Sequence, residues 1–150
     1  MFTRIMVGID DSFATGNVLS SAIEMALKFG AKLALCHALD DTPLAQQFAR
    51  VALPAGVAPV EASLRATAME FLDQAAEKAR EAGVEVEIQV IESEHDDAAE
   101  LLARAASAWQ ADLLVVGAKA HGSMTRFFAG GMGGKLVGIA PTALLVVRTA

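Results

Sequence analysis

Two glycine-bearing turns in the last third of the chain have the residue types needed to hold an anion. The first turn comes at Gly117, directly after the apolar run of residues 113–116, and the second is the glycine cluster of residues 130–134. Glycine lets the backbone approach a phosphate closely, and the first N–H groups of a helix have no partner within that helix. A strand, a glycine loop and a helix start in this order predict a phosphate cradle.

Three side chains between the two turns can carry positive charge, namely Lys119, His121 and Arg126. Any of them could face a phosphate, although loop charges of this kind are most often simply solvated. The glycine cluster also has a second interpretation, as a flexible or tightly packed turn without a ligand. Both interpretations stay open on the residues alone.

Other reactive side chains have plainer explanations. Asp10 follows an apolar run and could either contact a ligand or cap the next helix. His37 is more typical of a buried, hydrogen-bonded structural histidine, and it cannot serve as a base for Cys36 because successive strand side chains point to opposite faces. One acidic stretch could suggest a metal but is better explained by the helix dipole; it contains Glu92, Glu94, His95, Asp96 and Asp97.

The elements that must position these groups alternate along the chain. Apolar runs predict strands over residues 5–9, 32–39, 84–91, 113–116 and 141–148. Residues 84–91 alternate between apolar and polar, which predicts a strand covered on one face, near a sheet edge. The stretch 40–59, with Pro59 at its end, is predicted to be irregular.

Three- and four-residue spacing predicts four helices between these strands. The first helix is capped by Asp11, Ser12 or Thr15 and ended by Gly30, and the clearest one covers residues 61–82 before Gly83. The third helix is capped by Asp96 or Asp97, and a short fourth helix starts at Lys135, after the glycine cluster. The apolar stripe of the clearest helix is predicted at Leu64, Ala68, Phe71, Ala75, Ala79 and Ala82.

Strands separated by helices imply an α/β fold, with an open parallel sheet and helices on both of its faces. In such sheets ligands bind beyond the carboxyl ends of the strands, where the strand order reverses. Asp10, Ala38 and the loop at Gly117 follow or end the first, second and fourth strands. We therefore expect these three positions to converge.

The totals narrow the function classes. At 150 residues the chain is expected to form one domain, residues 1–150, and its 54% hydrophobic content is enough for a full core. A net charge of −6 argues against nonspecific binding to nucleic acid or an anionic membrane. A single cysteine excludes an intrachain disulfide, and no signal peptide or membrane span is recognisable. We expect a cytoplasmic protein.

Four segments resemble signature segments of the universal stress protein family. They read IMVGIDDS, LALCHALD, ADLLVVG and APTALLVVR, and the resemblance covers the whole chain. It implies a Rossmann-like sheet of the adenine-nucleotide α-hydrolase type, with five parallel strands in the order 3-2-1-4-5. It also implies a homodimer paired through the last strand, between Thr142 and Val147, and a stress-response role that is usually not enzymatic.

Nucleotide-binding members of that family carry G-x-x-G, nine residues, then G-S or G-T. Gly117 and Gly130 match this motif, but Ala120 replaces the second glycine and Gly131 replaces the hydroxyl residue. The resemblance implies that Asp10 contacts the ribose or the adenine edge and that the Ala38 backbone reads the adenine. The phosphates would be lined by Gly117, Ala120, His121, Gly130 and Gly131. The lost hydroxyl would weaken binding by roughly 1.5–3 kcal/mol, or about ten- to a hundredfold.

Three functions stay open. The favoured one is a dimeric regulator that binds ATP or AMP weakly, with Mg²⁺ only alongside ATP, because the backbone donors survive both substitutions. The alternative is a dimeric interaction protein of the same fold without nucleotide. An enzyme is least favoured, because the related α-hydrolases carry S-G-G-x-D-S where this chain has residues 8–12, GIDDS; weak ATPase activity is left open.

Overall fold

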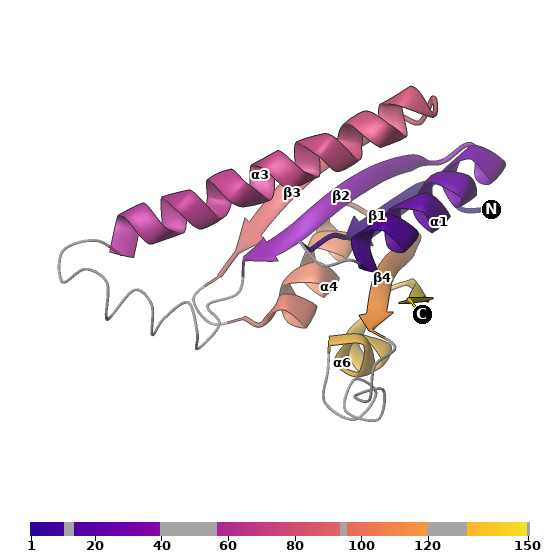
Figure 1. Ribbon diagram of the computed structural model, residues 1–150. Helices are drawn as coiled ribbons and strands as arrows, with labels where there is room; N and C mark the ends of the chain where they lie inside the picture. The colour runs from indigo at the N-terminus through magenta and orange to yellow at the C-terminus, as the bar shows by residue number, and fades with distance from the viewer. Residues whose placement is uncertain (11–13, 40–56, 94–95, 120–131, 150) are drawn as a thin grey trace.

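Helices and strands alternate along the chain, as predicted. The computed structural model describes residues 1–10, 14–39, 57–93, 96–119 and 132–149. Within this part the elements are β1 (Arg4–Gly8), α1 (Ala14–Phe29), β2 (Lys32–Leu39), α3 (Val57–Glu81), β3 (Val86–Glu92), α4 (Ala98–Ala108), β4 (Leu113–Lys119), α6 (Met132–Ile139) and β5 (Ala143–Thr149) (Figure 1).

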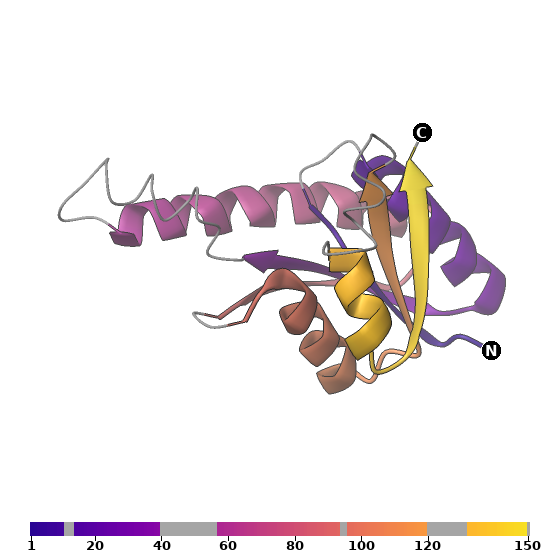
Figure 2. The ribbon, with the colours of Figure 1, turned by 90° about the horizontal axis from the view of Figure 1, so that it is seen from below.

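The five strands form one sheet in the order β3-β2-β1-β4-β5, and every pair of neighbours is parallel. This order confirms the predicted arrangement, including the place of β3 at an edge. Helices α1 and α3 cover one face of the sheet, and α4 and α6 cover the other (Figure 2). The chain leaves β1 towards β2 on one side and returns through β4 on the other, so the strand order reverses beside β1.

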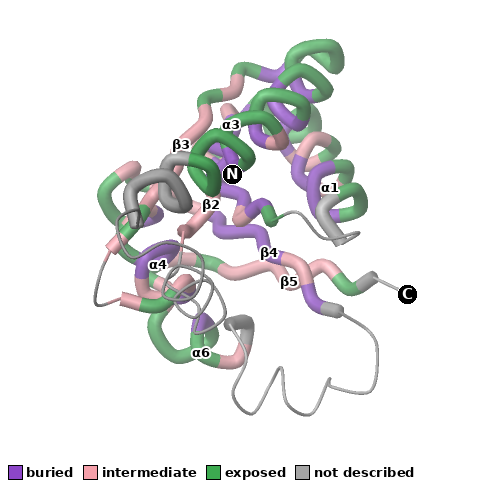
Figure 3. Tube along the Cα trace, turned by 60° about the vertical axis from the view of Figure 1, so that its left-hand side comes forward, coloured by how far each residue is buried: buried purple, intermediate pink, exposed green. Residues whose placement is uncertain are grey.

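The sheet separates two hydrophobic cores because successive strand residues point to opposite faces. Ile5 and Leu35 belong to the core under α1 and α3, whereas Met6 and Cys36 belong to the core under α4 and α6. Buried residues therefore follow the strands and the inward sides of the helices (Figure 3). The central strands are buried on both faces, which explains their unbroken apolar sequence.

Local signals at the helix ends are confirmed where the structure describes them. Gly30 and Gly83 have φ values of +66° and +89°, a backbone region that favours glycine, and they end α1 and α3. Asp97 caps α4, since its Oδ1 accepts a hydrogen bond from the Glu100 N–H at 3.0 Å. Thr15 lies within α1 and is not its cap, while Asp11 and Ser12 lie outside the described residues.

Two predictions about the longest helix were wrong. α3 begins at Val57, four residues earlier than expected, and contains Pro59 in its first turn, where a missing N–H costs no helical hydrogen bond. Leu64 is 44% exposed, while the unpredicted Leu72 is fully buried. The amino end of α3 extends past the carboxyl ends of β2 and β3, so this end of the helix has less of the sheet to pack against (Figures 1 and 2).

Other boundaries also moved. β3 begins at Val86 because Val84 N–H instead caps α3 by donating to the Ala79 carbonyl at 3.0 Å. α6 begins at Met132, inside the glycine cluster and three residues before the predicted start. β4 was expected to end at Gly117 but continues to Lys119, because pairing with β5 extends to its last residue.

Candidate functional site

Asp10, Ala38 and Gly117 lie at the same edge of the sheet. β1 is aligned with β2 so that Gly8 stands beside Cys36, which brings Asp10 level with Ala38 two residues further on. The alignment of Val7 with Val115 brings Gly117 to within one residue of that level. The structure therefore brings together the three candidate positions that it describes, at the reversal of strand order where open α/β sheets bind ligands.

The three positions offer different chemistry. Asp10 is exposed and presents a carboxylate directly after β1. Ala38 and Gly117 are half-buried within β2 and β4, so they contribute main-chain groups and no reactive side chain. A carboxylate beside main-chain donors and acceptors suits a ligand with hydroxyl groups and a hydrogen-bonding ring.

His37 supports this edge from inside the sheet. Its Nδ1 lies 2.7 Å from the Ile9 carbonyl oxygen, and its ring packs edge-on against Phe71 of α3, with centroids 4.9 Å apart. The predicted structural, hydrogen-bonded histidine is confirmed, although it is half-buried and not fully buried.

Cys36 lies on the other face of the sheet from His37, as predicted. Its side chain is fully buried in the core under α4 and α6, and burial raises the pKa of the thiol to about 12. The two side chains therefore do not form a nucleophile and base.

Lys119 is the last residue of β4, and the remaining candidate residues lie outside the described part of the chain. These are Ala120, His121, Gly130 and Gly131, together with Arg126 of the same loop. Helix α6, which follows them, is described from Met132 onward.

Two contacts fix α6 against α4. Leu136 is fully buried in the core between them, and the Lys135 ammonium group donates to the carboxylates of Asp97 and Glu100, the latter at 2.8 Å. The hydrogen bond from Lys135 lowers the pKa of Asp97 and of Glu100 from their ordinary values. Sequence reasoning missed this cluster because its partners are 35 and 38 residues apart and no spacing rule connects them.

The decisive comparison concerns the whole chain. Residues 1–148 match the Universal stress protein family. The chain belongs to this family. Comparison with curated proteins gave no significant match.

Solved structures of universal stress proteins share the fold. A family member from Burkholderia pseudomallei has a TM-score of 0.77 and 23% identity, over 99% of this chain and 97% of that one. A universal stress protein in complex with cAMP has a TM-score of 0.68 and 20% identity, covering 99% and 98%. One from Archaeoglobus fulgidus in complex with dAMP has a TM-score of 0.66 and 19% identity, covering 97% and 98%.

The acidic stretch of this universal stress protein is occupied by ion pairs. Glu92 pairs with Arg65 of α3, and Asp96 pairs with Arg104 at 2.7 Å. Glu94 and His95 lie outside the described residues. Among the described residues, no three histidine, cysteine, aspartate or glutamate side chains gather as metal ligands would. None of the described helices is both long enough and apolar enough to cross a bilayer.

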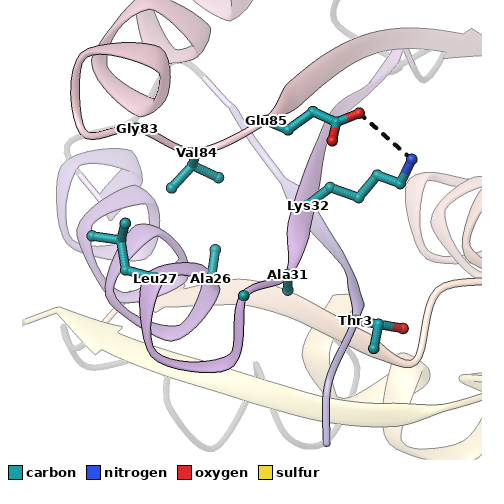
Figure 4. Close-up of a pocket in the computed structure, with 9 residues that line it drawn as sticks. Thr3, Ala26, Leu27, Ala31, Lys32, Gly83, Val84 and Glu85 are labelled. Atoms are coloured by element: carbon teal, nitrogen blue, oxygen red, sulfur yellow. Dashed lines mark ion pairs between the residues drawn. The ribbon is translucent and has the colours of Figure 1, made fainter.

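A cavity of about 400 Å³ lies at the opposite end of the sheet, among the amino ends of β1, β2 and β3 (Figure 4). The residues around it are Thr3, Ala26, Leu27, Gly30, Ala31, Lys32, Gly83, Val84 and Glu85. An ion pair of 3.6 Å between Lys32 and Glu85 borders it. None of the predicted site residues lines this cavity, so it is separate from the candidate site.

Proposed function

We propose that this universal stress protein is a cytoplasmic, non-enzymatic stress-response regulator that binds ATP or AMP weakly at the carboxyl edge of its sheet. The observation that carries the proposal is the meeting of Asp10, Ala38 and Gly117 at the reversal of strand order. An acidic side chain after the first strand suits ribose hydroxyl groups, and main-chain groups of Ala38 suit the edge of an adenine ring.

The phosphates would bind to main-chain groups between the end of β4 and the start of α6. The first turn of α6 supplies N–H groups that have no partner within the helix, together with the positive end of the helix dipole. Mg²⁺ would enter only with ATP, bound to its phosphates. Two solved relatives hold adenine nucleotides, cAMP in one and dAMP in the other, which supports this ligand class for the present chain.

We further propose that two copies pair through β5. The two edges of the sheet differ, because β3 carries the exposed charges of Glu87 and Glu92 while four consecutive residues of β5, 144–147, are apolar and half-buried. Charged side chains protect an edge strand from pairing, and apolar ones leave it open to pairing. Val137, 68% exposed on α6 beside β5, would extend the apolar surface.

The second candidate function is a dimeric interaction protein of the same fold without a nucleotide. Two departures from the nucleotide motif favour it, the β-carbon of Ala120 and the missing hydroxyl at Gly131. The apolar edge of β5 is equally compatible with this function, so only a measurement of nucleotide binding distinguishes the two functions.

Mass spectrometry of small molecules released from freshly purified protein, followed by titration calorimetry with ATP and AMP, tests the proposal. We expect a released adenine nucleotide or heat of binding at micromolar to millimolar ligand, and weaker binding by Asp10→Asn, which removes the charge and keeps the side-chain size. No released nucleotide and no heat at millimolar ligand would select the interaction protein. A phosphate-release assay, with Asp10→Ala as control, tests the absence of turnover.

A further inference from the structure

The main-chain hydrogen-bond ladder between β1 and β2 ends at Ile9. Its last bond runs from the Ile9 N–H to the Cys36 carbonyl at 2.8 Å. In a regular parallel ladder the next bond would run from the Ala38 N–H to the Ile9 carbonyl. The paired register ends instead at Gly8 and Cys36. No main-chain hydrogen bond joins the Ala38 N–H to the Ile9 carbonyl.

A side chain takes the place of the missing bond. The Ile9 carbonyl is 2.7 Å from the Nδ1 atom of His37. A carbonyl oxygen only accepts, so Nδ1 carries the hydrogen and donates it. Phe71 packs its ring against the imidazole at an interplanar angle of 89°, which keeps the ring turned towards Ile9.

This substitution changes what the edge of the sheet offers to a ligand. The Ile9 carbonyl is satisfied, as a partly buried main-chain acceptor must be, without using the Ala38 N–H. Ala38 thus presents both its N–H and its carbonyl beyond the end of β1, level with Asp10. One donor and one acceptor side by side complement adenine, whose pairing edge has a ring nitrogen acceptor beside an amino donor. Guanine presents the opposite order at the corresponding positions.

We propose that His37 is a positioning residue that sets the preference for adenine, because it occupies the Ile9 carbonyl and so reserves the Ala38 N–H for the base. The inference rests on the proposed nucleotide-binding function. His37 itself touches no ligand in this arrangement. Without its Nδ1 donor, the Ala38 N–H turns to the Ile9 carbonyl, the ladder gains its next bond, and the donor for adenine is lost.

The test compares ATP and GTP affinities by calorimetry in the full chain and in three variants. His37→Leu removes the donor and keeps an apolar side chain of similar size, and we expect the ratio of ATP to GTP affinity to fall about three- to tenfold. His37→Asn places an amide nitrogen near the position of Nδ1 and should keep the ratio within about twofold of the wild type. Val86→Ala thins the same core at the other end of β3, so it should lower the melting temperature and leave the ratio unchanged.

A second readout needs no nucleotide. Nitrogen NMR of the imidazole should show the hydrogen on Nδ1 in the neutral ring, and the Ala38 amide should exchange faster in the wild type than in His37→Leu. A hydrogen on Nε2, equal exchange in both proteins, or an unchanged nucleotide ratio in His37→Leu would overturn the role of His37 while nucleotide binding stood. Wild-type protein that binds neither nucleotide would overturn the proposed function, and with it the assignment of His37 to adenine selection, even if the ring and amide behave as expected.

Discussion

The ammonium group of Lys135 on α6 lies 2.8 Å from the carboxylate of Glu100 on α4. The same group also donates to Asp97, the residue that caps α4. α6 has only eight residues and is rich in glycine, so its own helix propensity is poor and its place depends on contacts with α4 and the sheet. These charges therefore help to hold the helix that begins where the candidate phosphate loop ends.

Replacing Lys135 with methionine should destabilise the protein slightly and in a salt-dependent way. All three charges are substantially exposed, so the loss is small at low salt and should vanish near 1 M salt, where screening acts within about 3 Å. Chemical denaturation at several salt concentrations measures this difference. Lys78→Met, on α3, removes the same charge and serves as the control; an equal effect in both variants would contradict the role of the ion pairs.

Asp112 should make the stability of the protein depend on acidity. Its carboxylate accepts hydrogen bonds from the Thr3 N–H at 2.7 Å, the Thr3 hydroxyl at 2.8 Å and the Arg4 N–H at 3.0 Å. Burial alone would raise the pKa of Asp112, but these donated bonds outweigh burial and lower it below its ordinary value. The folded pKa is the lower one, so this contribution is complete above the ordinary carboxyl pKa of about 3.9 and is lost as the pH falls through the folded value.

Asp112→Asn should weaken the same hydrogen bonds and lower the unfolding free energy measurably. The amide keeps one acceptor but sets an NH₂ group against donors, which should cost about 1–3 kcal/mol of unfolding free energy at neutral pH. The gap between wild type and variant should begin to narrow below about pH 3.9, where the carboxyl of the unfolded chain takes up its proton, and close once the pH has fallen through the lower folded pKa. A gap that stays constant from pH 7 down to pH 2 would show that the carboxylate charge is not what stabilises this corner.

Leu72 and Leu64 of α3 offer a matched pair on one helix. Leu72 is fully buried against the sheet, so Leu72→Ala should lower the unfolding free energy by about 2–5 kcal/mol. Leu64 is 44% exposed, and Leu64→Ala should change the unfolding free energy by less than about 0.5 kcal/mol. Urea denaturation of both variants checks the pair. Similar losses would mean that the amino end of α3 is covered in solution.

Two glycine-to-alanine changes should act with opposite sign. Gly83 has a φ of +89°, and although an added β-carbon would meet no atom within 4 Å, the backbone strain should cost about 1–2 kcal/mol. Gly138 lies in α6 with equally open surroundings and no such φ, so Gly138→Ala should stabilise by about 0.4–1 kcal/mol. Melting curves of both variants measure the contrast, and stabilisation by Gly83→Ala would contradict the left-handed turn.

The proposed pairing through β5 predicts a difference between the two sheet edges. Leu145→Pro removes a main-chain donor from β5 and should yield monomers by light scattering. Ile88→Pro places the same change in β3, at a position whose N–H also faces away from the sheet, and should leave the dimer intact, with circular dichroism confirming that both variants are folded. A dimer that survives Leu145→Pro, or a wild-type protein that is monomeric, rejects this interface.

The sequence predicted the sheet well because each central strand is buried on both faces and therefore has an unbroken apolar sequence. The residues that end or cap the neighbouring helices are also recognisable from their types alone. Gly30 and Gly83 end helices through a conformation that other residues avoid, and Asp97 announces the start of α4. The same logic placed Asp10, Ala38 and Gly117 at one edge, since carboxyl ends of parallel strands meet.

The features that the sequence did not reveal depend on where each helix begins, how much of it the sheet covers and how neighbouring strands are aligned. Pro59 looked like a helix breaker because nothing local says that a first turn begins at Val57. Leu64 fits the apolar stripe of α3 yet is 44% exposed, and the stripe carries no information on how much of the helix the sheet covers. The role of His37 depends on where the β1–β2 ladder stops, and only the alignment of the two strands determines that.

The burial of Cys36 restricts how this protein could sense an oxidant. Burial raises the pKa of its thiol to about 12, so the thiol stays protonated at neutral pH, and peroxides react with the ionised form. It is the one cysteine of the chain, and it is sealed beneath the sheet. While the protein is folded, therefore, an oxidant in solution has no exposed thiol of this chain to modify.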